Sequence, residues 1–214
     1  MSKKSITDEI NEQKTRGVLL ILTGPTGAGK DTLFAALKEK NPTIQSIITT
    51  SSRVMRENES DGKPYHFITR SEFEKKIANG DFFEWVEFRG ALYGTEKKIL
   101  DMALSSGSDV MWHIDTKGVK NIKEKVKAMT KRCVFVFLTA KSIDLLEARV
   151  RKDEGKNLHR WNEALVKWEM EQFDDCDYLV VNNDGHIDKA VSMVSAIIEA
   201  KRMEIIAKSM DKAV

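Results

Sequence analysis

The sequence is short of cysteine and of long apolar runs. Its two cysteines, Cys133 and Cys176, stand in unrelated contexts without the spacing of metal ligands, which favours a reducing, cytoplasmic compartment. The longest apolar runs, Val18 to Leu22 and Val134 to Leu138, fall far below the roughly 20 residues that cross a bilayer as a helix. We therefore expect neither a membrane span nor a membrane partner.

Net charge is also small. Lysine and arginine number 35 against 33 acidic residues, so the formal charge at pH 7 is +2. No global field draws such a chain to nucleic acid, and any anion site must be local. The 41% apolar and 32% charged content excludes an intrinsically disordered chain, and 214 residues suit one compact domain. Residues 1–17 lack the apolar core of a secretory signal, so we expect a flexible polar tail. A monomer and a homodimer both remain open.

Apolar runs alternate with segments of helical periodicity from residue 17 onward. This alternation predicts an α/β fold with a central parallel sheet covered by helices. The predicted strands are residues 18–22, 109–114, 133–138 and 178–181. The predicted helices are residues 30–40, 116–129, 142–152, 160–173 and 187–210.

Residues 50–95 follow a different pattern. Two short strand-like segments, YHFIT and FFEWVEF, flank a helical segment. We predict that Ser71 and Glu74 form a capping box at the start of this helix and that Gly80 ends it. The region is therefore expected to be an inserted α+β lobe.

A glycine-rich loop stands between the first predicted strand and the first predicted helix. It comprises Gly24, Pro25, Thr26, Gly27, Ala28, Gly29, Lys30, Asp31 and Thr32. Backbone N–H groups of such a loop bind a phosphate chain together with the N-terminus of the helix, and Lys30 is placed to reach the outer phosphates. The strand-loop-helix setting favours an ATP-binding P-loop over a merely tight turn.

Asp31 stands where P-loops commonly carry Ser or Thr, and Thr32 follows it. We name both as candidate ligands of Mg²⁺, directly or through water, because this cation prefers hard oxygen donors. The alternative for Asp31 is a simple interaction with the helix dipole in the first helical turn.

Arg53, Arg56 and Tyr65 form a second candidate anion site. Two guanidinium groups and a phenol are suited to hold a monophosphate. The alternative is a pair of solvated surface arginines.

The chain resembles the guanylate kinase family from about Val18 through the C-terminal helix. The resemblance rests on the phosphate loop, on T-x-x-x-R-x-x-R with Tyr65, and on the segments FFEW, YGT, H-I-D-x-x-G and VNND in this order. It implies a three-layer P-loop NTPase fold and ATP-dependent phosphorylation of GMP and dGMP with Mg²⁺. It also implies one domain over residues 18–214, with a core (18–49 and 96–214), a GMP-binding lobe (50–95) and a short mobile lid (about 150–162).

The resemblance assigns the acceptor nucleotide to eight residues. It implies that the GMP phosphate is held by Arg53, Arg56, Tyr65 and Tyr93. It also implies that the base faces Thr49, Glu84, Thr95 and Asp115. The chemistry of Glu84 agrees, because a carboxylate accepts two hydrogen bonds from the N1–H and exocyclic amine of guanine, whereas adenine presents an acceptor at N1. Without this motif, the preferred interpretation of Glu84 is an outward polar residue that alternates with Phe83 and Trp85 in a strand.

One departure from the family pattern lies at the end of the strand before Asp115. His113 occupies a position where the family commonly carries a carboxylate near the metal and the phosphates. An imidazole does not replace that carboxylate as a magnesium ligand. We hypothesise that Asp31 partly compensates for the lost acid; the alternative for His113 is a purely structural role.

A second departure lies in the lid. Arg149 and Arg160 match two arginines of the segment that closes on ATP, and with Lys30 we expect them to be catalytic. A third arginine position falls on or near Asp153, for which Arg151 or Lys152 is the candidate substitute. An ordinary charged amphipathic helix is the alternative for this segment.

Asn182 completes the predicted ATP site. In the family the matching residue lies near the adenine, whereas asparagine here is also typical of a turn.

Three interpretations of function follow. The first is an ATP:GMP phosphotransferase whose partners are small nucleotides. The second is a related kinase with another acceptor, such as ribose 1,5-bisphosphate, because the GKD spelling of the loop resembles those enzymes. The third is a non-catalytic guanylate-kinase-like binding module, against which the retained Gly24, Gly29 and Lys30 argue.

Overall fold

The structure is a computed structural model that describes residues 17–57, 59–63, 65–88, 90–154, 161–184 and 186–210. Its centre is a five-stranded parallel sheet in the order β2-β7-β1-β8-β9. The strands are β1 (Leu19–Thr23), β2 (Gln45–Ile47), β7 (Val110–His113), β8 (Cys133–Thr139) and β9 (Tyr178–Val181). The predicted α/β fold with a parallel sheet is confirmed.

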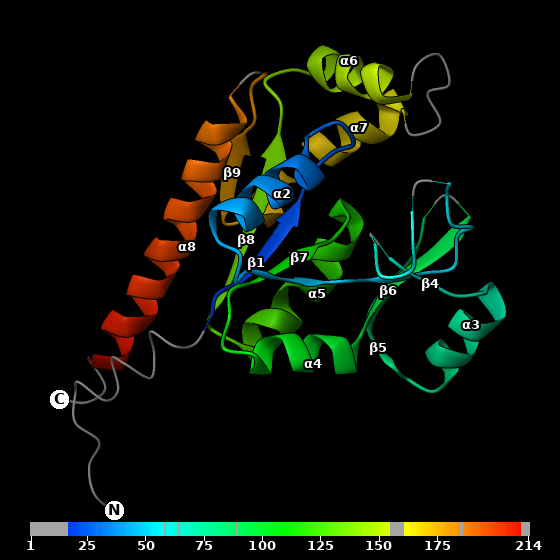
Figure 1. Cartoon of the computed structure of the whole chain (residues 1–214), viewed down its shortest axis with the longest axis horizontal. Coiled ribbons are helices and arrows are strands. Elements are labelled where there is room, and N and C mark those ends of the chain that lie inside the picture. Colours follow the sequence, from blue (N-terminus) through cyan, green and yellow to red (C-terminus); the bar gives the residue numbers. More distant parts are fainter. Residues whose placement is uncertain are drawn as a thin grey trace, which may run out of the picture.

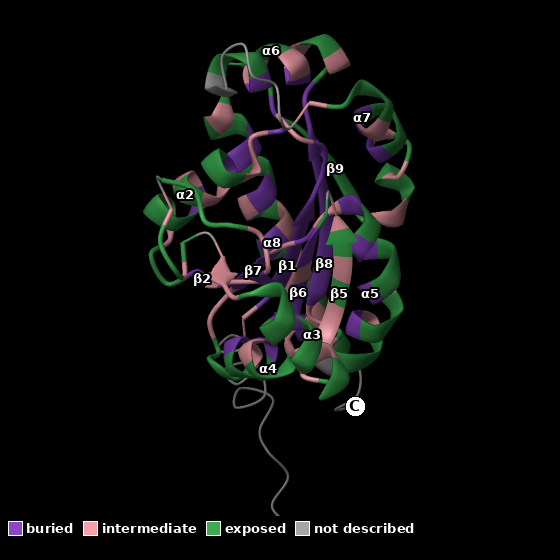
Figure 2. Cartoon of the chain, turned by 90° about the vertical axis from the view of Figure 1, so that its right-hand side faces the viewer, coloured by how far each residue is buried: buried purple, intermediate pink, exposed green. Residues whose placement is uncertain are grey.

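Helices cover both faces of this sheet, so the domain has three layers (Figure 1). On one face the apolar core joins strand residues such as Leu20 and Leu22 to α2 (Lys30–Lys40), α6 (Ile143–Glu154), α7 (Glu163–Met170) and α8 (Ile187–Met210). On the other face, Leu19 and Ile21 pack against α4 (Lys97–Ser105) and α5 (Thr116–Met129). Successive side chains of β1 alternate between the two cores, and the buried strands lie between exposed helix surfaces in Figure 2. Among the helices of the described residues, none has the length and apolar content of a membrane span.

A second, smaller sheet lies within residues 50–96, in the order β4-β3-β6-β5. Its strands are β3 (Thr50–Ser51), β4 (His66–Phe67), β5 (Phe82–Phe88) and β6 (Ala91–Glu96), and it carries helix α3 (Arg70–Ala78). The rings of Phe73 and Phe82 stack at 4.3 Å between centroids and, with Leu92, form a separate small core.

The capping box of α3 lies two residues earlier than predicted. The Thr69 hydroxyl accepts from the Glu72 N–H at 3.2 Å, and the Glu72 carboxylate accepts from the Thr69 N–H at 2.8 Å. The sequence offers the same Thr/Ser-x-x-Glu spacing twice. Thr69 has the extended backbone of a helix N-cap, and this decides the helix start in its favour.

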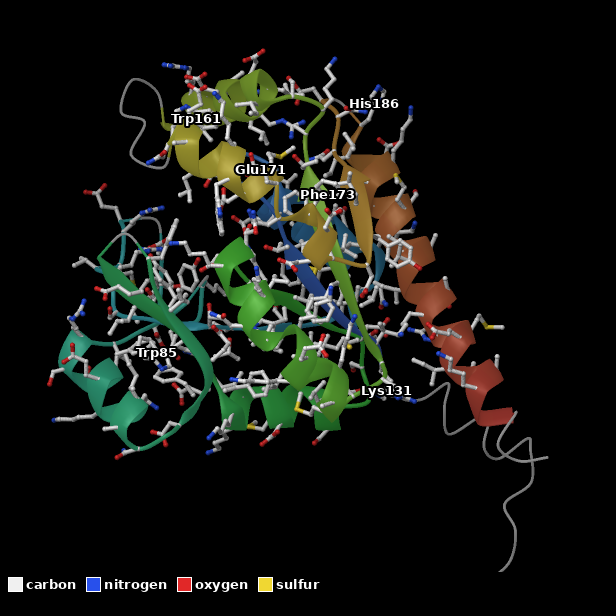
Figure 3. All side chains as sticks on the ribbon, turned by 180° about the vertical axis from the view of Figure 1, so that it is seen from behind. Trp85, Lys131, Trp161, Glu171, Phe173 and His186 are labelled. Carbon is white, nitrogen blue, oxygen red and sulfur yellow. The ribbon has the colours of Figure 1, made fainter. Side chains whose placement is uncertain are left out.

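Two further elements differ from prediction. The helix predicted over residues 160–173 is shorter: the Asn162 side chain caps α7, which ends at Met170, and a 3₁₀ turn, η1 (Phe173–Asp175), follows. Strand β9 has the predicted bounds but lies at the sheet edge, with only Val180 buried. Phe173, the first residue of η1, is exposed (labelled in Figure 3).

Candidate active site

The phosphate loop connects the carboxyl end of β1 to the start of α2, as predicted. Gly24, Gly27 and Gly29 have positive φ angles of 137°, 85° and 87°. A Cβ at Gly24 would stand 1.9 Å from the Leu138 carbonyl oxygen, and one at Gly27 would stand 2.5 Å from that of Leu146. Only glycine meets both the backbone conformation and this close packing, so β8 and α6 fix the course of the loop.

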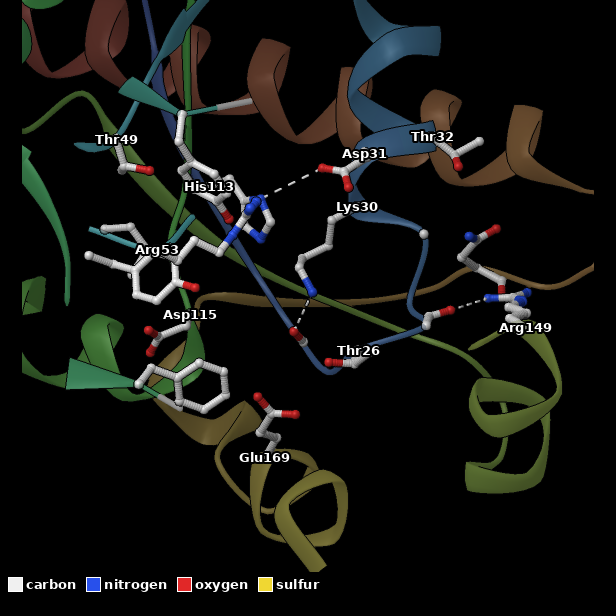
Figure 4. A pocket seen from close by; sticks show the side chains of 18 of the residues that line it. Thr26, Lys30, Asp31, Thr32, Thr49, Arg53, His113, Asp115, Arg149 and Glu169 are labelled. Atoms are coloured by element: carbon white, nitrogen blue, oxygen red, sulfur yellow. Dashed lines mark hydrogen bonds and ion pairs between the residues drawn. The ribbon is translucent and has the colours of Figure 1, made fainter. Parts of the chain in front are cut away.

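Lys30 closes the loop. Its Nζ donates to the carbonyl oxygens of Gly24 at 2.6 Å and Pro25 at 2.9 Å (Figure 4). Ala28 is fully buried beneath the loop, and of the predicted loop residues all except Ala28 and Pro25 line the cleft. The ammonium group is therefore held against the loop backbone at the N-terminus of α2, a setting that suits a polyphosphate.

A cleft of about 720 Å³ runs from this loop to the smaller sheet. Its volume is typical of small-ligand sites. Most predicted acceptor residues line it: Thr49, Arg53, Arg56, Tyr65, Glu84, Tyr93 and Asp115. The tertiary structure thus brings two predicted anion sites from separate parts of the chain into one cleft.

His113 and Asp31 face each other near the centre of this cleft. The Nδ1 of His113 lies 3.9 Å from Oδ1 of Asp31. Burial, and then repulsion from Lys30, lower the pKa of His113 to about 4, although 38% of its side chain is exposed to the open cleft. The imidazole is therefore neutral near pH 7 and adds no positive charge beside Lys30.

Asp31 and Thr32 offer oxygen donors at the start of α2. Both are exposed and line the cleft beside the loop. Within the described residues, no cluster of three or more His, Cys, Asp or Glu side chains is arranged to hold a metal. Mg²⁺ needs no such cluster, because it usually keeps several waters and binds substrate phosphates together with one or two protein oxygens. The donor set fits this ion.

A network built on Arg53 forms the acceptor side. Its guanidinium donates to both carboxylate oxygens of Glu59, at 2.7 and 2.6 Å, and lies 5.3 and 5.1 Å from the ring centroids of Tyr65 and Phe67. Burial, followed by the neighbouring Tyr93, raises the pKa of Tyr65 to about 12, so this phenol stays a hydrogen-bond donor.

Glu59 itself lines the cleft and was not among the predicted site residues. The available signal was an acid three residues after Arg56, in a loop whose fold no local pattern specifies.

Glu84 lies at the far end of the cleft. Burial is the largest cause that raises its pKa, to about 7; hydrogen bonds from the Thr95 hydroxyl and N–H oppose this, and the charge of Asp115 adds to it. Asp115 caps α5, its Oδ1 accepting from the Gly118 N–H at 2.9 Å. Thr95 is fully buried behind the cleft surface, and its Oγ1 accepts from the Trp112 indole N–H at 3.0 Å. Thr95 therefore supports Glu84 from behind.

On the lid side, Arg149 is tied to two loops. It donates to Asp184 at 2.8 Å, to the Asn182 carbonyl at 2.8 Å and to the Gly27 carbonyl at 3.3 Å. The Asn182 side-chain amide, itself buried, donates to the Ala28 carbonyl at 2.9 Å. Asn182 thus holds the phosphate loop, a role that sequence analysis did not foresee.

Of the two candidates for the third lid cation, only Lys152 lines the cleft. Arg151 pairs with Glu147 on its own helix, whereas Lys152 lines the cleft. Arg160 and the side chain of Asp153 lie outside the described residues. Glu169 of α7, 7% exposed, also lines the cleft and was missed because nothing in its local sequence separates it from surface acids (Figure 4).

A family model described as guanylate kinase matches residues 16–201. The chain belongs to the guanylate kinase family. It is 36% identical over 192 residues to the guanylate kinase of Carboxydothermus hydrogenoformans, covering 88% of this chain and 91% of that one. It is 35% identical over 206 residues to the guanylate kinase of Maricaulis maris, covering 95% and 92%.

Comparison with solved structures agrees. The crystal structure of guanylate kinase from Anaplasma phagocytophilum matches with a TM-score of 0.70 at 25% identity, covering 88% of each chain. The resemblance stated from sequence motifs is thereby confirmed. In this guanylate kinase family member, the fold places the phosphate loop and the Glu84 end in a common cleft.

Proposed function

We propose that this chain transfers the γ-phosphoryl group of ATP to GMP, and to dGMP, yielding ADP and the nucleoside diphosphate. Family membership supports the reaction type. The observation that carries the acceptor is the carboxylate of Glu84, which faces the same cleft as the phosphate loop. Ionised, it accepts from two donors of guanine, whereas adenine would leave it opposite an acceptor.

The chemistry asks mainly for alignment and charge neutralisation. Lys30 and the loop amides would bind the outer phosphates of ATP, and Arg53, Arg56, Tyr65 and Tyr93 would hold the GMP phosphate. An oxygen of that phosphate attacks the γ-phosphorus, a P–O bond forms, and the bond to the β-phosphate oxygen breaks as ADP leaves. No general base is needed, because the attacking phosphate is already an anion near pH 7.

Arg149 would join the donor site by exchanging its partner Asp184 for a phosphate oxygen. Lys152 is the cleft-lining candidate for the third lid cation, and Arg160 stays a proposal from sequence. Asp31 and Thr32 would hold Mg²⁺, which supplies charge neutralisation on the phosphates when it is bound.

The domain organisation follows from this assignment. Residues 50–95 would form the GMP-binding lobe, 18–49 and 96–214 the core, and about 150–162 the lid, of which residues 155–160 lie outside the described part. Closure of lobe and lid over both nucleotides would exclude water and hinder ATP hydrolysis.

A coupled assay of ADP formation tests the proposal with GMP, dGMP, AMP and ribose 1,5-bisphosphate as acceptors. We expect turnover with GMP and dGMP, and loss of guanine selectivity in Glu84→Gln. Glu87→Gln is the matched control, because Glu87 lies on the same strand, is exposed and pairs with Arg70. Turnover of the sugar alone would establish a different acceptor, and no turnover with any acceptor would favour a binding module.

A further inference from the structure

Trp112 links the two sheets behind the end of the cleft that Glu84 lines. It lies on β7 of the five-stranded sheet with 0% of its surface exposed. Its indole N–H donates to Thr95 Oγ1 on β6 of the smaller sheet at 3.0 Å, and its ring meets Phe83 edge-on at 5.9 Å. An aromatic ring without a polar atom could also fill this buried space. The indole N–H therefore contributes something besides packing, namely the hydrogen bond to Thr95.

This hydrogen bond fixes the orientation of the Thr95 hydroxyl group. An indole N–H only donates, so Thr95 Oγ1 must act as its acceptor. The single proton of the hydroxyl then points to another partner, and that partner is the carboxylate of Glu84. Glu84 and Thr95 face each other in the β5–β6 register.

We infer that Trp112 is a positioning residue for guanine recognition, which acts through Thr95 to orient the Glu84 carboxylate as a hydrogen-bond acceptor toward the base. The inference deepens the proposed function and rests on it. Trp112 itself does not touch the nucleotide.

The other groups around Glu84 make this hydrogen bond consequential. Asp115, at the N-cap of α5, repels the charged carboxylate, and Lys125 of the same helix attracts it weakly. A Cβ at Gly118 would stand 3.9 Å from Glu84 Oε2, so α5 packs closely against the carboxylate. The Thr95 hydroxyl and N–H are the hydrogen-bond donors that lower the pKa of Glu84 against the effect of burial. If the Thr95 hydroxyl loses its fixed orientation, its hydrogen bond to Glu84 weakens, and the pKa of Glu84 should rise.

The test substitution is Trp112→Phe, which keeps an aromatic ring and removes the N–H. We expect KM for GMP to rise about 3- to 10-fold, the range of one net hydrogen bond, with kcat and KM for ATP changed less than about 2-fold. We also expect the acid limb of the pH profile of kcat/KM for GMP to move up by about 0.5–1 pH unit. A merely structural role would not move that limb.

Four companion variants make the result decisive. Thr95→Val should shift the acid limb in the same direction, Thr95→Ser should retain the parent profile, and Trp112→Phe added to Thr95→Val should cause little further change. Phe83→Leu disturbs the same aromatic contact without touching the hydroxyl, and should lower thermal stability while leaving the acid limb in place. Circular dichroism melts of every variant report folding.

The inference is overturned if Trp112→Phe leaves the acid limb unchanged, if Phe83→Leu shifts it equally, or if the two substitutions in the pair act additively. Should Trp112→Phe not fold, an unshifted limb in Thr95→Val overturns it as well. Absence of GMP phosphorylation by the parent protein is a separate result, and it contradicts the proposed function.

Discussion

His113 Nδ1 and Asp31 Oδ1 lie 3.9 Å apart, facing each other beside the phosphate loop. The pair joins the end of β7 to the first turn of α2, two segments that the sequence separates widely. With its lowered pKa, His113 is neutral at pH 7 and places no positive charge beside Asp31. This geometry places an acid close to the position where the family pattern has lost one.

The first prediction concerns Asp31. Replacing it with Asn or Gly should raise the Mg²⁺ concentration for half-maximal turnover by roughly 3- to 10-fold, because an oxygen donor near the metal and phosphates is lost or neutralised. Turnover measured across a magnesium titration checks this. Glu39→Gln, an exposed acid later on α2, is the control. Superimposable magnesium curves for Asp31→Gly and the parent would remove the idea of compensation for His113.

A second prediction concerns pH and GMP. Glu84 must be ionised to accept both guanine donors, and its pKa in the free protein is about 7. Below that pH, we expect kcat/KM for GMP to fall up to about 10-fold per pH unit, while KM for ATP changes little. Steady-state profiles over pH 5.5–8.5 measure this. A flat GMP profile across pH 6–7 would show that Glu84 does not titrate there.

The same group predicts an effect on stability. A folded-state pKa raised from 4.5 to about 7 means that the stabilising contribution is complete below pH 4.5 and is lost as pH rises through 7. At pH 8 the charged Glu84 therefore destabilises the protein without nucleotide, and Glu84→Gln should stabilise it by about 1–3 kcal/mol. Urea denaturation at pH 5 and pH 8 measures the difference. Equal effects at both pH values would contradict this assignment.

Glu59 gives a fourth prediction. Its two hydrogen bonds from Arg53 hold the guanidinium against Tyr65 and Phe67, and the hydrogen bond from Arg53 is the largest cause that lowers the pKa of Glu59. Glu59→Gln should raise KM for GMP by roughly 5- to 20-fold, because Arg53 loses its fixed orientation. Glu57→Gln is the control, since Glu57 is an exposed acid in the same loop. A larger loss of ATP affinity than of GMP affinity would contradict the acceptor role.

The fifth prediction separates close packing from backbone conformation. Gly24 and Gly90 both have positive φ angles, but a Cβ at Gly24 meets the Leu138 carbonyl at 1.9 Å, whereas one at Gly90 meets nothing within 4 Å. Gly90→Ala should cost only about 1–2 kcal/mol of left-handed strain. Gly24→Ala should cost more than about 3 kcal/mol and abolish ATP binding. Denaturation and nucleotide titration of both variants check this, and equal losses of stability would show that the contact with β8 is unimportant.

Features that depend on residues close together in the sequence were predictable from it. The phosphate loop is nine consecutive residues between an apolar run and a periodic segment, and it forms where predicted. Helices α5 and α8 have their predicted bounds, because apolar residues at helical spacing must face one core. The predicted position of the α3 capping box was wrong by two residues, because Thr69–Glu72 and Ser71–Glu74 have the same spacing in the sequence. The extended backbone at Thr69 makes Thr69 the N-cap.

The sequence by itself determined the family, the phosphate loop and most of the residues that line the cleft, because each is encoded by local spacing. Only the tertiary structure decided which of these residues contact one another. Asn182 holds Ala28 from 154 positions away, and Trp112 reaches Thr95 across 17, between two different sheets. Such hydrogen bonds exist only after strands distant in the chain have packed side by side, and no local pattern specifies which polar atoms then meet.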